Sequence, residues 1–119
     1  MARSLLIVSR QPPWSGLGAR EALDIALAGG AYDLPLGLLF LDDGVLQLKR
    51  GQHPEAVGQK DLTANLQALP LFGVDTLLAC RHSLHLRGLT EADLALPVRV
   101  LDTPQLRALF ETYDEVITL

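Results

Sequence analysis

The only cysteine of the chain, Cys80, lies where an apolar run, residues 74–79, gives way to a short polar segment, residues 81–88. The first pattern predicts a buried strand and the second a short helix. The start of a helix offers unpaired N–H groups and a positive dipole end, which stabilise the thiolate that attacks sulfur or carbon. Cys80 is therefore the candidate catalytic residue. The alternative is a cysteine that only fills space at the end of a strand.

Two histidines follow this cysteine closely. Cys80, His82 and His85 form a C-x-H-x-x-H pattern of residue types that bind zinc. Arg81 and Arg87 flank the group, and no nearby acid adds a ligand or orients one. Histidines on the surface of a helix explain the spacing equally well, so we expect no metal. A Cys–His dyad, in which one imidazole lowers the pKa of the thiol, stays open.

A pair of carboxylates, Asp42 and Asp43, follows a second apolar run. Paired carboxylates can perform acid–base chemistry, but at the start of a helix they commonly cap it and oppose its dipole. We expect this structural role, as capping and dipole partners, here. The sequence thus gives little support to an acid–base site at this position.

A glycine pair in residues 16–18 resembles the beginning of a dinucleotide-binding fingerprint. The third glycine position holds Glu21, whose carboxylate would repel a pyrophosphate, and the chain has no P-loop sequence. We therefore expect no nucleotide and no other cofactor.

Size and charge exclude several classes of function. A chain of 119 residues fits one domain, spanning 1–119. Ten Lys and Arg against fourteen Asp and Glu give a net charge of −4, and the basic residues are scattered, which disfavours direct nucleic-acid binding. A single cysteine allows no internal disulfide, and with neither a secretory signal nor a membrane span the expected location is the cytoplasm. A hydrophobic fraction of 49% is high for this size, so some apolar surface is expected to face other subunits.

Apolar runs alternate with helical patterns along the chain, which predicts an α/β fold. Strands are expected at 4–9, 35–41, 74–79, 98–101 and 115–119. Helices are expected at 17–28, stopped by Gly29 and Gly30, around Leu62 to Leu69, ended by Pro70, after Cys80, and from Asp102 or Thr103 with Pro104 in first position. This order builds a single, mainly parallel five-stranded sheet with helices on both faces, a flavodoxin-like three-layer arrangement. Trp14, Asp42, Asp43 and Cys80 should then gather at the carboxyl ends of the strands.

Several of these segments, taken in order, carry a family resemblance. They are residues 9–13, 20–24, 43–48, 51–57, 69–72 and 113–118, together with Cys80, Ser83, Leu84 and residues 87–89. The chain resembles the DsrE/DsrF-like family of sulfur-relay proteins, most closely its TusC (DsrF) branch. The similarity covers nearly the whole sequence.

The resemblance implies a cytoplasmic complex in which TusB-, TusC- and TusD-like subunits form a dimer of heterotrimers. Sulfur from a cysteine desulfurase passes through such complexes as a persulfide toward 2-thiolation of the wobble uridine of certain tRNAs. Relatives in sulfur-oxidising bacteria serve dissimilatory sulfur trafficking. In both systems the principal carrier is the TusD/DsrE-like subunit.

Cys80 matches the position of that carrier's cysteine. Arg81 and His82, however, stand where the carriers have small residues, and their bulk can obstruct an approaching thiolate. The sequence therefore favours a structural, non-catalytic partner subunit. The alternatives are a direct persulfide carrier that uses Cys80 and a small binding domain for a nucleotide or a metal.

Overall fold

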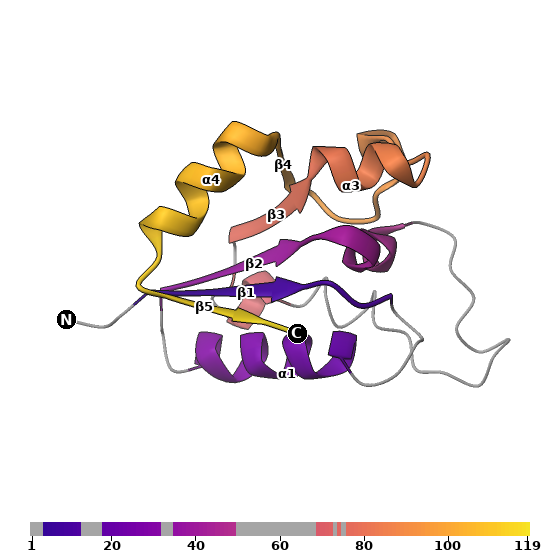
Figure 1. Ribbon diagram of the computed structural model, residues 1–119. Helices are drawn as coiled ribbons and strands as arrows, with labels where there is room; N and C mark the ends of the chain where they lie inside the picture. Colours follow the sequence, from indigo (N-terminus) through magenta and orange to yellow (C-terminus); the bar gives the residue numbers. More distant parts are fainter. Residues whose placement is uncertain (1–3, 13–17, 32–34, 50–68, 73, 75) are drawn as a thin grey trace, which may run out of the picture.

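Five parallel strands form the sheet of the protein. The computed structural model describes residues 4–12, 18–31, 35–49, 69–72, 74 and 76–119. The strands are β1 (Leu5–Ser9), β2 (Leu36–Phe40), β3 (Thr76–Cys80), β4 (Arg99–Leu101) and β5 (Glu115–Thr118). They lie in the order β4-β3-β2-β1-β5, and each neighbouring pair is parallel (Figure 1). The predicted five-stranded parallel sheet is confirmed.

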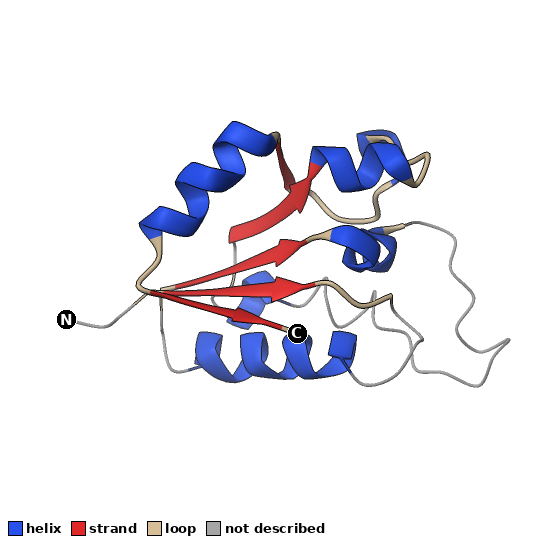
Figure 2. Ribbon diagram, in the orientation of Figure 1, coloured by secondary structure: helices blue, strands red, loops and turns tan. Residues whose placement is uncertain are grey.

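Helices cover both faces of the sheet (Figure 2). On one face lies α1 (Gly18–Ala31) and on the other α4 (Thr103–Thr112). The short helices η1 (Asp42–Leu48) and α3 (Arg81–Leu86) begin where β2 and β3 end. Among the described residues, 3-10 turns also occur at η3 (Leu69–Phe72) and η4 (Glu91–Asp93). Of the helices that the structure describes, none is long and apolar enough to cross a membrane.

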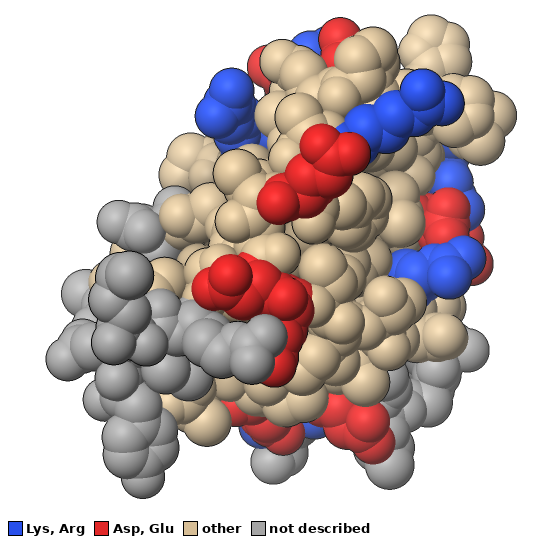
Figure 3. Space-filling model, turned by 60° about the vertical axis from the view of Figure 1, so that its left-hand side comes forward, with Lys and Arg blue, Asp and Glu red and all other residues tan. Residues whose placement is uncertain are grey.

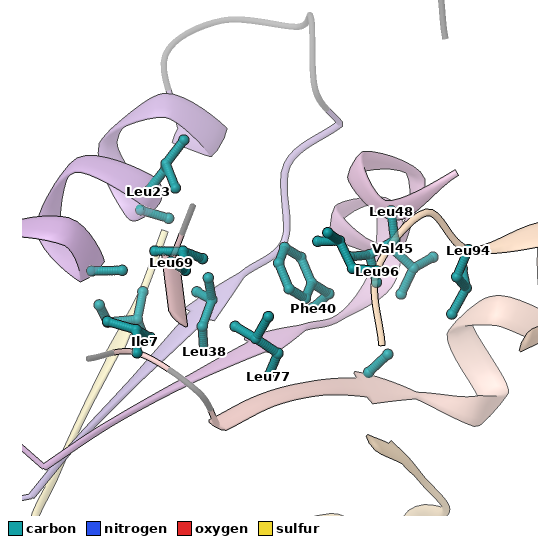
Figure 4. Close-up of a cluster of buried hydrophobic side chains, with 14 of the residues drawn as sticks. Ile7, Leu23, Leu38, Phe40, Val45, Leu48, Leu69, Leu77, Leu94 and Leu96 are labelled. Carbon is teal, nitrogen blue, oxygen red and sulfur yellow. The ribbon is translucent and has the colours of Figure 1, made fainter. Parts of the chain in front are cut away.

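Each central strand is buried on both faces, which explains its unbroken apolar sequence. Side chains of odd-numbered β1 residues and even-numbered β2 residues face α1. They pack with Leu23 of that helix and with Leu69 of η3 in the larger apolar cluster (Figure 4). The alternate side chains form a second cluster beneath α4, where Leu106 covers Leu6, Val8 and Leu39. The sheet thus separates two cores: α4 covers the smaller one, and α1 covers the larger one together with residues of η1, η3 and α3.

The predicted end of α1 was wrong. Helix α1 does not stop at Gly29 and Gly30 but runs through both to Ala31, and both glycines are buried. A glycine weakens a helix without ending it when packing compensates for the lost propensity. Pro70 is the second residue of η3, where its missing N–H is not needed. The rest of the helix predicted before it lies outside the described residues.

The sequence left Asp102 and Thr103 as alternative capping residues of α4. Asp102 is the N-cap: its Oδ1 accepts the Gln105 N–H at 3.2 Å, and Gln105 Oε1 accepts the Asp102 N–H at 2.9 Å. Thr103 and Pro104 are then the first and second helical residues, so the predicted first position of Pro104 was off by one. Such a reciprocal capping box stabilises a helix by about 1 kcal/mol.

Two of the described glycines lie so close to other atoms that an added methyl group would overlap them. A methyl group on Gly44 would overlap the carbonyl oxygen of Ser9, at the point where η1 crosses the end of β1. A methyl group on Gly37 would overlap the hydroxyl of Tyr113. Burial raises the pKa of that phenol. The contact at Gly44 is made by backbone atoms, which have little freedom to move aside.

We expect Gly44→Ala to lower the free energy of unfolding by about 2–3 kcal/mol, because the new methyl group must displace backbone rather than a flexible side chain. Gly88→Ala is the matched control: Gly88 has φ +67°, but no atom lies within 4 Å of its added methyl group. Its cost is only the left-handed backbone, about 1 kcal/mol. Urea unfolding of both variants measures the difference, and an equal or smaller loss at Gly44 contradicts the prediction.

Candidate functional site

Polar side chains from three neighbouring strands meet at the carboxyl edge of the sheet. Arg10 follows β1, Asp42 and Asp43 follow β2, and Cys80 ends β3. The predicted gathering of Asp42, Asp43 and Cys80 at this edge is confirmed. Trp14 was expected beside them and lies outside the described residues.

Cys80 is a buried side chain, only 4% exposed. It belongs to the cluster beneath α4, with Leu78, Leu101 and Leu106 among its members. It is also the N-cap of α3, because its Sγ accepts the backbone N–H of Ser83 at 3.4 Å. The thiol therefore has two structural roles, packing and capping. A partner's thiolate can reach the sulfur only if this region opens.

Ser83 connects the first turn of α3 to η1. Its side chain is 3% exposed, and its Oγ accepts the backbone N–H of Asp42 at 2.9 Å. Asp42 has φ +52°, a left-handed backbone that aspartate tolerates better than most residues. Ser83 therefore bonds on one side to the strained turn after β2 and on the other to the sulfur of Cys80.

Two ion pairs lie across this edge. Arg10 donates from Nη2 and Nε to Oδ2 of Asp42, at 2.7 and 2.8 Å. Arg87 donates from Nη2 and Nε to Oδ1 of Asp43, at 2.8 and 3.0 Å, and from Nη1 to the carbonyl of Ser83 at 3.1 Å. Exposed pairs of this kind contribute at most about 1 kcal/mol each. Their effect here is to fix how η1 and α3 sit over the strand ends.

The two aspartates do not cap η1, so the capping part of the prediction was wrong. The N-cap is Leu41, and no side chain makes a capping hydrogen bond there. Both carboxylates do lie in the first turn of η1, where they oppose its dipole as expected. Because the sheet places Arg10 beside one carboxylate and Arg87 beside the other, charge pairing replaces capping.

Gln47 is a buried polar residue that sequence reasoning missed. Its side chain is 2% exposed, and its Nε2 donates to Oγ of Ser9 at 2.7 Å and to the carbonyl of Gln11 at 3.0 Å. An amide buried with its hydrogen bonds made fixes the chain just after β1. The sequence feature that could have indicated its burial is that Gln47 occupies a position within the otherwise apolar segment 45–48.

An open, polar pocket of about 430 Å³ adjoins these ion pairs. Its lining comprises Arg10, Gln11, Asp42, Asp43, Thr118 and Leu119. Three of these side chains are the charged groups paired within this edge, so the pocket wall is close to neutral where Arg10 meets Asp42.

The structure does not assemble the Cys–His–His set. His82 and His85 are exposed on α3, whereas the sulfur of Cys80 is buried. Among the described residues, no three His, Cys, Asp or Glu side chains lie together so that they could hold a metal ion. On the face drawn in Figure 3, Lys and Arg are scattered and several of them lie beside Asp or Glu.

Comparison with known proteins gives close relatives over the full chain. A TusC homolog from Pseudomonas aeruginosa is 66% identical over 119 residues and is covered completely, as is this chain. A TusC homolog from Vibrio vulnificus is 32% identical over 114 residues, with 96% of this chain and 97% of that protein covered. The intracellular sulfur oxidation protein DsrF of Allochromatium vinosum is 37% identical over 94 residues, covering 79% of this chain and 69% of DsrF.

Solved structures share the fold at lower identity. The YchN protein of E. coli superposes with a TM-score of 0.83 at 24% identity, with both chains covered completely. A protein of unknown function from Methanobacterium thermoautotrophicum gives a TM-score of 0.65 at 18% identity, again over both full chains. A model of the DsrE/DsrF-like family matches residues 3–119. With relatives at this identity and a family match over this span, the chain belongs to the DsrE/DsrF-like family.

Proposed function

We propose that this protein is a structural subunit of a cytoplasmic, TusBCD-like sulfur-relay complex that passes persulfide sulfur toward 2-thiolation of the tRNA wobble uridine. Full-length identity of 66% to a TusC homolog supports this branch over the dissimilatory one, whose DsrF relative is 37% identical over 94 residues. Sulfur trafficking of the DsrEFH type is the second candidate because that relative is a sulfur oxidation protein.

The observation that carries the structural role is the burial of Cys80. Persulfide transfer requires an attacking thiolate to approach the sulfur in line with the bond that breaks. The Cys80 sulfur instead lies in an apolar cluster with a hydrogen bond from the Ser83 N–H. Direct carriage by Cys80, the runner-up, would first require the elements around the sulfur to move apart and expose it.

The partners in this proposal are TusB-like and TusD-like subunits, assembled as a dimer of heterotrimers, with the TusD-like cysteine as the main carrier. The link to a cysteine desulfurase and to tRNA is indirect. Exposed large apolar side chains support an assembled state: Leu86 is 67% exposed and Phe110 is 38% exposed.

We expect Cys80 to be protected from thiol reagents in the folded chain, because reaction must wait for local opening. A disulfide reagent such as DTNB should modify it about 100-fold more slowly than in denaturant. The control is Ala108→Cys in a Cys80→Ser background, which places a thiol at an exposed position of α4. If native Cys80 reacts as fast as this control, the prediction is wrong: the sulfur is accessible, which favours the carrier role.

We expect Cys80→Ser to leave the complex assembled and 2-thiouridine nearly unchanged, because the sulfur serves packing and capping. The equivalent change in the TusD-like subunit should abolish thiolation. Size-exclusion chromatography of the co-expressed subunits and nucleoside analysis of tRNA from each strain measure the two outcomes. Loss of 2-thiouridine from Cys80→Ser with the complex intact would establish Cys80 as a working carrier.

We expect the purified chain to bind tRNA poorly, with a dissociation constant above about 10 μM at 150 mM salt, because its net charge is −4 and its basic residues are dispersed. Filter binding over a salt series checks this. Tight binding that weakens steeply with salt contradicts the indirect link to tRNA.

A further inference from the structure

The outer strand β5 is exposed along its whole length. All four of its residues are exposed, including Val116 at 41% and Ile117 at 37%. The register places Val116 beside Leu6 on the α4 side of the sheet and Ile117 beside Ile7 on the α1 side. Strands of parallel sheets are normally covered on both faces, so this strand is unusual in exposing a branched apolar residue on each. Figure 1 shows β5 at the edge, in front of β1.

The outer side of β5 also presents backbone hydrogen-bonding groups. Glu115 and Leu119 donate their N–H groups to the carbonyls of Ser4 and Val8. Directions alternate along a strand, so the N–H and C=O groups of Val116 and Thr118 point away from β1. In the sheet formed by the described residues, β5 is the last strand in the order. Within the strand, no proline, lysine or bulge blocks this edge, although natural edge strands commonly use such features to prevent pairing.

We propose that β5 pairs with β5 of a second copy of this chain, antiparallel across a two-fold axis at Ile117. In this register Val116 of each copy lies opposite Thr118 of the other. Both are residues whose backbone groups point outward, so the two pairs exchange four N–H···O=C bonds. The inference concerns this chain alone and does not rest on the proposed function.

Alternative two-fold registers are less favourable. A shift that places Val116 opposite Val116 would need Asp114 opposite Thr118 to complete the ladder, but the N–H of Asp114 is bonded to Oγ of Ser4 at 3.0 Å. A further shift would place the two Glu115 carboxylates directly opposite each other, and their like charges would repel. The register centred on Ile117 places each Glu115 opposite Leu119 instead. A second copy therefore satisfies both the hydrogen bonds and the charges of this edge.

The contact is small, and we expect a dimer with a dissociation constant on the order of 10 μM. Analytical ultracentrifugation of the purified full chain, from about 1 to 200 μM, should show monomer converting to dimer. Thr118→Pro should keep the chain monomeric, because it removes an outward N–H without touching the bonds to β1. Circular dichroism verifies that this variant stays folded. A folded wild-type chain that remains monomeric throughout overturns the proposal.

Disulfide trapping tests the register. In a Cys80→Ser background, Ile117→Cys should form a covalent dimer under mild oxidation, because directly opposed residues of a non-hydrogen-bonded pair lie about 4.5 Å apart between Cα atoms. Val116→Cys is the matched control: its exposure is similar, at 41% against 37%, but in this register the two copies of residue 116 are not opposite each other. Trapping through Val116→Cys in preference to Ile117→Cys, or equal trapping of both, overturns the two-fold pairing at Ile117.

Discussion

The contact between the end of β1 and the turn after β2 determines the geometry of the whole carboxyl edge. Gly44 lets η1 lie directly on the carbonyl of Ser9, and the N–H of Leu41 donates to the same carbonyl at 3.1 Å. Gln47 adds a buried hydrogen bond to the Ser9 side chain. These bonds hold the backbone of η1 close to β1. The charged side chains at its start are then directed toward the arginines on either side.

A series of hydrogen bonds connects the turn after β2 to Cys80. Asp42 takes a left-handed backbone, its N–H is bonded to Ser83, and the N–H of Ser83 is bonded to the sulfur of Cys80. Arg87 joins Asp43 to the carbonyl of Ser83 and so ties α3 to η1. Each bond is modest alone, but together they couple three strand ends. Movement of α3 that exposes the sulfur must break several of them at once.

Sequence patterns predicted the parts of this fold that depend on burial. Strands buried on both faces read as continuous apolar runs, so β1 to β3 were placed within two residues at either end. The polar contacts could not be predicted in the same way, because the pairing between Arg10 and Asp42 depends on which strands are neighbours in the sheet. The hydrogen bonds of Gln47 and the ion pairs depend on tertiary contacts. The continuation of α1 through Gly29 and Gly30 depends on packing. The exposure of β5 could not be predicted either, because residues 115–119 have the composition of a strand that is covered on both faces.

The setting of Cys80 also limits what its sulfur can become. A persulfide adds a second sulfur atom beyond Sγ, and that atom needs space. Cys80 packs in the cluster beneath α4, which includes Leu101 and Leu106, and its Sγ also accepts the N–H of Ser83. Close-packed cores have little room for an extra atom, and a charged persulfide in an apolar cluster costs several kcal/mol more. A stable persulfide on Cys80 therefore requires the elements packed around the sulfur to move apart. In the arrangement described here the residue strengthens the join between β3 and α3 instead.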